Sequence, residues 1–382
     1  MSFRVSTIEA SRAITLIQDA TFRTSWNELY SSCPWATEYQ SPPYLMAWFH
    51  FCRDRFSPLG IEGRDDAGRL VGLLWLAKDR RNGEVVCAGH ADAEYQGWLA
   101  QPDVHERFSD AAFSAYCARQ DANPLTFKVI LPSLPLEWSR QSGRWSHLIL
   151  HEHAIRPLIH TDRSARSKSE GKRDKGKLNC LKKQGRLEFL RLRSIAELQS
   201  CWPTISEQYD RRIANDFGGE PFCGQFFFEC LRRDPTLVQG FALVLNGRII
   251  AAIIGARCKD SLVLEISTFD ESFAAQSPSR LLVPMVADAI REDGYRYFDL
   301  SPGGDWKIAM ATKTEMVTTL TIHPTYASAM KDQTKRKIKL LAKHGLSHLG
   351  IDYHVRRKVE QSLRSSMNLI KRQIAKPSRW AS

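Results

Sequence analysis

Residues 240–300 decide the fold, and they read GFALVLNGRIIAAIIGARCKDSLVLEISTFDESFAAQSPSRLLVPMVADAIREDGYRYFDL. Asn246-Gly247 separates two apolar runs, and this pair favours a tight hairpin because both central turn positions require positive φ. The rest of the stretch predicts a third strand, a loop, an amphipathic helix and a closing strand. The expected strands are 240–245, 248–256, 261–268 and 295–300, and the expected helix is 281–292.

The first half of the chain repeats this order about 170–180 positions earlier. Residue identity between the two halves is low, so the prediction rests on the order of elements. We therefore predict two copies of one mixed-sheet α/β (α+β) fold. The corresponding expected strands are 59–62, 70–77, 85–88 and 125–131, and the expected helix is 105–120.

The composition is that of an ordinary globular protein. The chain has 382 residues, of which 43% are hydrophobic and 25% charged, and this is enough to build hydrophobic cores without staples. No apolar run approaches about 18 residues, so no membrane-spanning helix is expected, and the first residues lack the apolar stretch of a signal peptide. The nine cysteines form no CxxC pair, which predicts free thiols in a reducing cytoplasm and no zinc site.

Basic charge is concentrated in two segments. The formal net charge is +12, but residues 161–195 carry +8 and residues 326–382 carry +11, so the remainder is acidic. Such segments suit an anionic partner, either nucleic acid or an anionic membrane face, although solvated linkers have the same composition. Residues 161–186 form the clearest domain boundary, with a helix expected over 175–184. Helices are expected in the tail at 331–343 and 355–374.

The junction at 276–282, QSPSRLL, has features of a phosphate site. It follows an expected strand and opens an expected helix, whose first-turn N–H groups favour phosphate oxygens. The small side chains of Ser277 and Ser279 let a ligand approach the backbone, and Arg280 adds a charged donor. An ordinary capped surface helix is the alternative, with Ser277 or Ser279 as the N-cap.

Five short patches follow one another along the chain: Tyr39–Trp48, Tyr95-Gln96-Gly97, Leu178–Gly185, Ser277–Leu282 and Phe298–Lys307. In this order and spacing they resemble the CelD/BcsL-type acetyltransferases of the GNAT superfamily, which are related to the FemAB-type transferases. Leu281 and Leu282 belong to the fourth patch, which resembles the "SPG-x-LL" of that group. Ser279 replaces its usual glycine, and 302–305 reads PGGD where an Arg-Gly-Asp-Glu is usual.

The resemblance implies two tandem GNAT-like domains and transfer of an acetyl or other acyl group from coenzyme A, without a metal, often in cell-surface polysaccharide biosynthesis. The acceptor would be an amine or hydroxyl of a small molecule or saccharide. The coenzyme would lie at Ser277, Ser279, Arg280, Leu281 and Leu282. The expected division is 1–160 and 187–325 for the domains, 161–186 for a basic linker helix and 326–382 for a basic helical tail.

Direct attack on an activated thioester requires an oriented acceptor, a group that polarises the carbonyl and a proton acceptor. Asp305 and Lys307 follow the last strand in a glycine-rich loop, where functional groups often lie. Asp299 and Glu265 are acids within expected strands, and Tyr95 lies in the second patch. Each of the five candidates also has a structural interpretation, as a turn residue, a solvated charge or a half-buried hydrogen-bonding group.

Two alternatives remain open. A FemAB-like aminoacyl transferase would use the basic segments 161–195 and 326–382 to hold charged tRNA. A non-catalytic adaptor would use the same segments to hold nucleic acid or an anionic membrane. The expected location is cytoplasmic, with peripheral attachment to the inner membrane face as a further possibility. His151 and His153 alternate on an expected strand without a nearby third ligand, so no metal site is predicted.

Overall fold

The computed structural model describes residues 2–140, 143–162, 171–216 and 225–348. Its contacts define two compact units, one ending at Pro324 and one beginning at Thr325, close to the expected start of the tail. The second unit contains α11 (Tyr326–His348), which includes the helix expected at 331–343. Cys223 and the helix expected at 355–374 lie outside the described residues. None of the described helices is long and apolar enough to cross a membrane.

The first half builds an antiparallel sheet in the order β1-β2-β3-β4, with β5 on the free stretch of β3. The hairpin, third strand and helix expected here are all present, and α4 ends three residues before the expected position. The strands are β1 (Phe3–Ile8), β2 (Phe56–Asp65), β3 (Leu70–Asp79), β4 (Val85–Cys87) and β5 (Leu99–Ala100). The helices are α1 (Ala10–Gln18), α2 (Ala20–Ser32), η1 (Glu38–Gln40), α3 (Pro42–Phe51) and α4 (His105–Cys117).

The second sheet has eight strands in the order β6-β13-β7-β12-β11-β10-β9-β8. All neighbours are antiparallel except β11 and β12. The strands are β6 (Leu125–Ile130), β7 (Ile149–His160), β8 (Leu187–Leu192), β9 (Val238–Leu245), β10 (Arg248–Cys258), β11 (Ser261–Phe269), β12 (Tyr297–Asp299) and β13 (Lys313–Ile322). The remaining elements of this unit are η2 (Glu137–Ser139), α5 (Trp145–Leu148), α6 (Gly171–Gln184), α7 (Ile195–Asp216), α8 (Gln225–Arg233), η4 (Glu271–Gln276), α9 (Pro278–Glu292) and α10 (Asp305–Met310).

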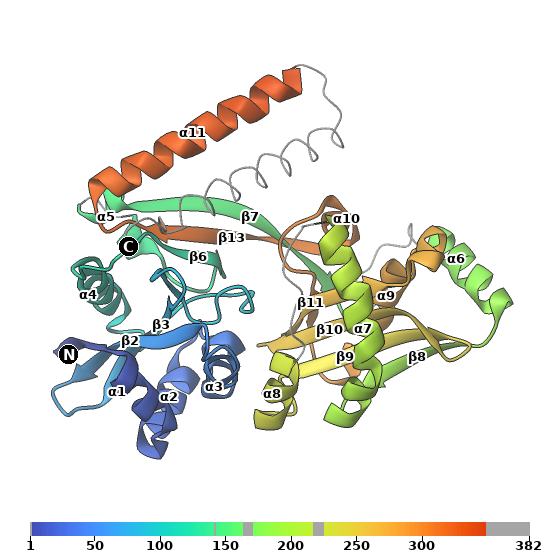
Figure 1. Ribbon diagram of the computed structural model, residues 1–382, viewed down its shortest axis with the longest axis horizontal. Coiled ribbons are helices and arrows are strands. Elements are labelled where there is room, and N and C mark those ends of the chain that lie inside the picture. The colour runs from blue at the N-terminus through green and yellow to red at the C-terminus, as the bar shows by residue number, and fades with distance from the viewer. Residues whose placement is uncertain (1, 141–142, 163–170, 217–224, 349–382) are drawn as a thin grey trace, which may run out of the picture. The chain divides into compact units, whose positions relative to one another are not determined.

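The two halves share this second sheet. In Figure 1 the long strands β7 and β13 run side by side, and their register is continuous from Ile149↔Ile322 to Leu158↔Lys313. β7 also pairs with β12 of the second half, while β13 returns to pair with β6 of the first. The sheet therefore continues through the boundary expected near residue 160, and the expected four-part division of the chain stays a prediction.

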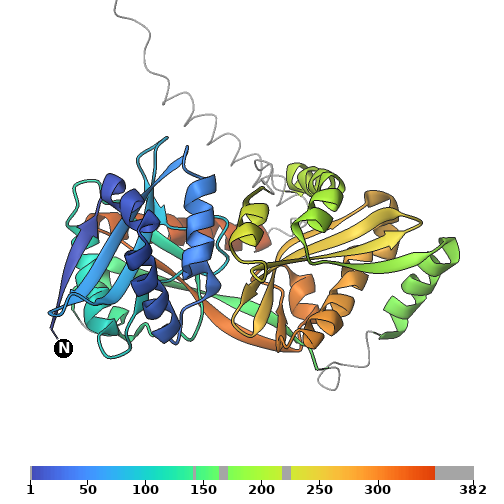
Figure 2. The ribbon, with the colours of Figure 1, turned by 90° about the horizontal axis from the view of Figure 1, so that it is seen from below.

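Helices cover both faces of the second sheet, as Figure 2 shows for α9 on one face and α7 on the other. Alternate residues of β10 therefore enter different cores: Ile253 packs with α9, and Ile254 packs on the opposite side. The hairpin expected at Asn246-Gly247 is confirmed, with φ of 50° and 81° at the two residues. α9 begins at Pro278, three residues before the expected position, because proline is favoured in a first helical turn.

Gly255 of β10 provides a test of the core. A methyl group added there would lie 2.6 Å from Leu262 Cγ, closer than atoms pack, whereas exposed Gly176 of α6 has open space around it. We expect Gly255→Ala to lower the free energy of unfolding by about 1–3 kcal/mol through overpacking. Gly176→Ala should raise it by about 0.5–1 kcal/mol, because alanine favours the helix. Urea unfolding measures both, and equal effects would contradict the packing.

Candidate active site

The site begins at an irregularity in β11. In the pairing of β10 with β11, Ile254 lies opposite Ile266 while the next residue, Gly255, lies opposite Leu264. Glu265 is thus an extra residue, which is the definition of a β-bulge. The bulge reverses the alternation of side chains, since Leu264 packs on the α9 side and Ile266 on the opposite side. A bulge therefore gives this acid its own direction out of the sheet.

β11 and β12 part at the same place. They pair in parallel at three positions, from Ser261↔Tyr297 to Val263↔Asp299, and β12 ends there. The closing strand is therefore shorter than the 295–300 expected. β11 continues to Phe269 with β10 as its partner. The edge of β11 beyond Val263 thus has no β12 backbone beside it, and Glu265 lies at the start of this unpaired edge.

Glu265 meets the first half of the chain. The Tyr39 hydroxyl donates a hydrogen bond to Glu265 Oε1 over 2.5 Å. Burial is the main cause that raises the pKa of Glu265 to about 8, and the negative charge of Glu94 raises it further. Glu94 has its own pKa raised to about 7, mainly by burial, while Lys307 opposes that rise. Burial likewise raises the pKa of Asp92. Glu265 and Glu94 therefore change charge near neutral pH, as general bases do.

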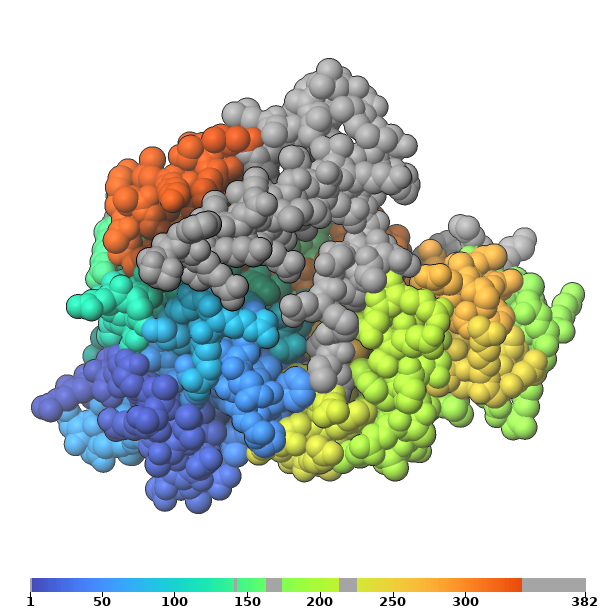
Figure 3. Space-filling model, in the orientation of Figure 1, coloured from blue at the N-terminus to red at the C-terminus, as the bar shows by residue number. Residues whose placement is uncertain are grey.

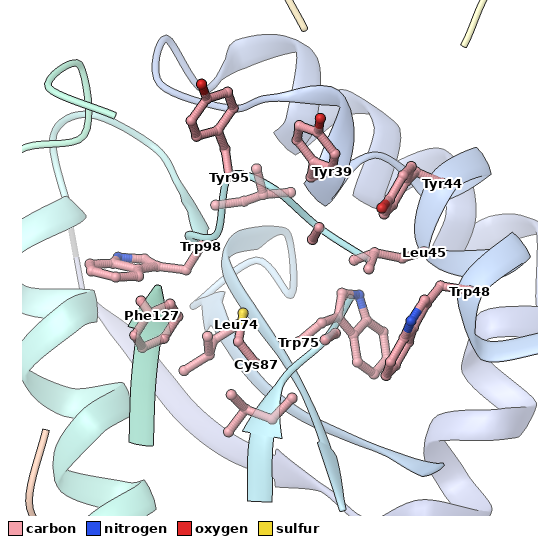
Figure 4. Packing of buried hydrophobic residues seen from close by; sticks show 14 of the residues in the cluster. Tyr39, Tyr44, Leu45, Trp48, Leu74, Trp75, Cys87, Tyr95, Trp98 and Phe127 are labelled. Atoms are coloured by element: carbon pink, nitrogen blue, oxygen red, sulfur yellow. The ribbon is translucent and has the colours of Figure 1, made fainter. Parts of the chain in front are cut away.

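The Tyr39–Trp48 patch holds the loop that carries Asp92 and Tyr95. Its Gln40 side chain donates to the Tyr95 carbonyl at 3.0 Å, and its Trp48 indole donates to Asp92 Oδ2 at 2.8 Å. Figure 4 shows the rings of Tyr39 and Tyr95 over the buried cluster, with both hydroxyls turned away from Trp75. The patch is therefore a support that fixes the first-half wall of the site.

The same patch contacts the second half at a further point. Glu38 accepts a hydrogen bond from the Lys259 backbone at 2.8 Å and pairs with Arg257 at 3.2 Å. Both partners belong to the end of β10 and its turn into β11. Figure 3 shows the surfaces of the two halves meeting where α8 lies against α3. The position of Tyr39 relative to Glu265 is thus fixed by contacts on both sides.

Asp299 and Tyr95 belong to a buried ionic network. Asp299, with its side chain fully buried, pairs with Arg156 at 2.6 Å and accepts a hydrogen bond from the Tyr95 hydroxyl at 2.5 Å. Arg156 also pairs with Glu315 of β13 at 2.9 Å, and the carboxylate of Asp299 raises the pKa of the guanidinium. Every charge in this network has a partner. Its geometry is that of a structural tie between the halves, which positions Tyr95.

Lys307 and Asp305 differ in their surroundings. The Lys307 ammonium donates to Ser301 Oγ at 2.9 Å, and burial lowers its pKa although Glu94 and Asp299 oppose that shift. Lys307 is therefore a charged neighbour of the acidic group. Asp305 is exposed in the first turn of α10. Among the described residues, no hydrogen bond or ion pair links Asp305 to the carboxyl groups of the site.

The α9 N-terminus lies next to this strand. The Ser267 hydroxyl, two residues beyond Glu265, is 3.2 Å from that of Ser279, so the helix start lies about 7 Å along β11 from the acid. Ser277 is left-handed (φ 52°) and does not cap α9 with its side chain, which instead accepts from Lys177 of α6 at 2.8 Å. Arg280 lies 3.7 Å from Asp174 of the same helix.

Lys177 and Arg280 therefore lie beside the first turn of α9, whose backbone amides have no side-chain cap. This combination suits a phosphate group. Leu281 and Leu282 are buried in the core under α9, so they anchor the helix and are not available to a ligand.

Sequence reasoning missed several of the groups that meet here. Asp92, Glu94 and Arg156 lie in segments with no local pattern of their own, and they become neighbours of Glu265 and Asp299 only when the halves pack. Tyr39 belongs to the first patch, but its contact with Glu265 spans 226 positions, so no local pattern indicates it. Lys177 lies in the basic helix α6, and the sequence shows this excess of basic residues. An anion site predicted at 276–282 is a reason to look for a lysine from such a helix beside it.

Residues 168–307 match the family model described as "Acetyltransferase (GNAT) domain". This segment contains Glu265, the start of α9 and Lys307, so the part of the chain that carries the open strand edge is similar to a GNAT acetyltransferase domain. No curated protein matches the chain in sequence. Within the described residues, no group of three potential metal ligands occurs, and eight cysteines are free.

Solved structures share the overall fold at low identity. The structure of FemX is 10% identical, covers 79% of this chain and 96% of that one, and has a TM-score of 0.53. The structure of L-PGS from Bacillus licheniformis is 12% identical, with coverage of 80% and 92% and a TM-score of 0.50. A conserved protein of unknown function from Bacteroides thetaiotaomicron VPI-5482 is 11% identical, with coverage of 84% and 100% and a TM-score of 0.50. The fold is thus mixed α/β with two sheets, consistent with tandem GNAT-like domains.

The Asp299 network predicts a large effect on stability. Asp299→Ala removes the main partner of a buried guanidinium, so we expect the free energy of unfolding to fall by about 3 kcal/mol. Tyr95→Phe removes one hydrogen bond to the same carboxylate and should cost about 1 kcal/mol. Denaturant unfolding at pH 7 measures both. If the two substitutions had equal, small effects, the network would not be the tie between the halves that its geometry indicates.

Proposed function

We propose that this protein is an acyltransferase of the CelD/BcsL type, which moves an acetyl or other acyl group from acyl-coenzyme A to an amine or hydroxyl, with Glu265 as the proton acceptor. One observation carries the proposal: a carboxyl group with a pKa of about 8 lies in a bulge where β11 and β12 part, on the strand that leads to the open N-terminus of α9. The GNAT match over residues 168–307 supports it.

The coenzyme would lie along the open edge of β11. The first-turn amides of α9, Lys177 and Arg280 would hold the pyrophosphate. The edge of β11 beyond Val263, where Arg212 donates a hydrogen bond to the Ser267 carbonyl, would offer its other backbone groups to the pantetheine arm. A backbone N–H of this edge is suited to polarise the thioester oxygen, because it is fixed before reaction. The small side chain of Ser279 leaves the backbone accessible, as a glycine would.

The acceptor would enter from the seam between the halves, by which we mean the contact region where Tyr39 meets Glu265. Its nitrogen or oxygen attacks the thioester carbon, a bond forms from that atom to the acyl group, and the bond from carbon to sulfur breaks. Glu265 takes the proton that the acceptor loses, and the thiolate of coenzyme A leaves with the electron pair of the broken bond. Tyr39 orients the Glu265 carboxylate through its hydrogen bond. Cell-surface saccharides are the acceptor class that we propose first.

The proposed role of Glu265 as proton acceptor predicts how kcat/KM depends on pH. Because Glu265 must be deprotonated to act, kcat/KM for acyl transfer should rise with pH and level off above about 8. Glu265→Gln should lower kcat by about 10²–10⁴-fold and remove this rise. Glu94→Gln should move the rise to lower pH, because a negative neighbour no longer opposes ionisation of Glu265. Glu188→Gln is the control, because Glu188 is half-buried on the edge strand β8 and not among the residues of the site.

If kcat/KM of Glu265→Gln still rises with pH as in the wild-type protein, Glu265 is not the base. With the acceptor unidentified, coenzyme A release from acetyl-coenzyme A with a panel of amino sugars and polyols as acceptors gives the readout.

The coenzyme part is tested separately by calorimetry with coenzyme A and acetyl-coenzyme A. We expect saturable binding at one site and at least about tenfold weaker binding in Ser279→Asp, because the new carboxylate opposes the pyrophosphate. Ser206→Asp is the matched control, since its hydroxyl bonds within α7 on the other face of the sheet.

Equal affinity in both variants would remove this site from the proposal. If the wild-type protein binds neither compound but transfers an aminoacyl group from charged tRNA, the FemAB-like alternative replaces it.

A further inference from the structure

A second concave site lies mainly on the first half, with one residue of α8 at its rim, and away from the residues used above. It has a volume of about 300 Å³ and is formed where α1, α3, the start of β2 and the end of α8 meet. Its apolar wall includes Ile17, Phe49 and Phe56, which are buried, and Ile14, which is 43% exposed. Ile14 is thus partly exposed at the edge of the pocket, where a bound apolar group would cover it.

Cationic side chains stand at the rim of this pocket. Arg53, Arg80 and Arg233 line it, together with His50. Arg233 is paired with Glu229 at 2.8 Å. Within the part of the chain that the structure describes, Arg53 and Arg80 have no carboxylate partner. The pocket therefore combines an apolar interior with at least two uncompensated guanidinium groups.

From this combination we infer that the first-half pocket binds a single-chain amphiphile with a carboxylate head, its chain against Ile14, Ile17 and Phe49 and its head between Arg53 and Arg80. Guanidinium groups are weakly hydrated and match a carboxylate with two parallel hydrogen bonds, so they act well at an apolar boundary. A volume of about 300 Å³ is at the lower end for small-molecule sites, which suits one chain of medium length.

The site does not depend on the proposed acyl transfer. Its residues are distinct from Glu265, Glu94 and the start of α9, although α3 carries Tyr44 toward Asp92 and Phe49 toward the pocket. The two sites therefore share one helix, and each can be tested without the other.

The test is isothermal calorimetry of the full-length protein with decanoate below its micellar concentration, without any acyl-coenzyme A. Decylamine has the same chain with the opposite charge, and acetate has the head without the chain. We expect one saturable site for decanoate, at least about tenfold weaker binding of decylamine, and no measurable binding of acetate.

Three variants locate the site. Arg53→Glu and Arg80→Glu should each weaken decanoate binding by about tenfold or more. Arg81→Glu is the matched control, because Arg81 is the exposed neighbour of Arg80 and does not line the pocket. All three side chains are exposed, and circular dichroism with thermal melting checks that the variants fold.

Equal effects of Arg80→Glu and Arg81→Glu, or equal binding of decylamine and decanoate, would overturn the inference. The absence of saturable decanoate binding would also overturn it. If the protein instead associates only with anionic vesicles, the surface faces a membrane and the inference is equally wrong.

Discussion

The extra residue in β11 is the constraint on which the site depends. In a regular strand, residues two apart share a face, so residues 265 and 267 would point the same way. Because of the bulge, Glu265 faces Tyr39 of the first half, whereas Ser267 faces Ser279 at the start of α9. Thr268 then faces α7, where it bonds Gln208. Because of one inserted residue, the same strand directs Glu265 toward the first half and Ser267 toward the start of α9.

The seam between the halves gives that acid its chemistry. Two strands, β7 and β13, join both halves in one sheet, since β7 pairs with β12 of the second half and β13 pairs with β6 of the first. The η1–α3 segment then closes over the second sheet, with Tyr39 on Glu265 and Glu38 on Arg257. Excluding water from a carboxyl group disfavours its charged form, and this is the main cause of the raised pKa of Glu265. The tertiary contact therefore raises the pKa of the carboxyl group that we propose as the base.

Two groups of acids at the seam have opposite roles for a physical reason. Asp299 is paired with Arg156 and hydrogen-bonded by Tyr95, so its charge is compensated inside the protein. Glu265 has one neutral hydrogen-bond donor, Tyr39, and a like charge nearby, Glu94. A buried carboxylate whose charge is compensated by a guanidinium suits a structural role. Burial without such a partner raises the pKa, as it does for Glu265, and suits exchange of a proton with a substrate.

The sequence by itself determined the elements and their order. Local patterns were sufficient for the Asn246-Gly247 hairpin, the buried strand β10 and the helix α9, because turn geometry and side-chain periodicity act over a few residues. They also marked Glu265 and Asp299 as unusual acids within strands, without separating their roles. Only the tertiary structure decided that Glu265 occupies a bulge, that Asp299 pairs with Arg156, and that Glu94 lies near both. The ion pair of Asp299 and the burial of Glu265 depend on residues more than a hundred positions away, and the bulge depends on how two neighbouring strands pair. No local pattern encodes these contacts.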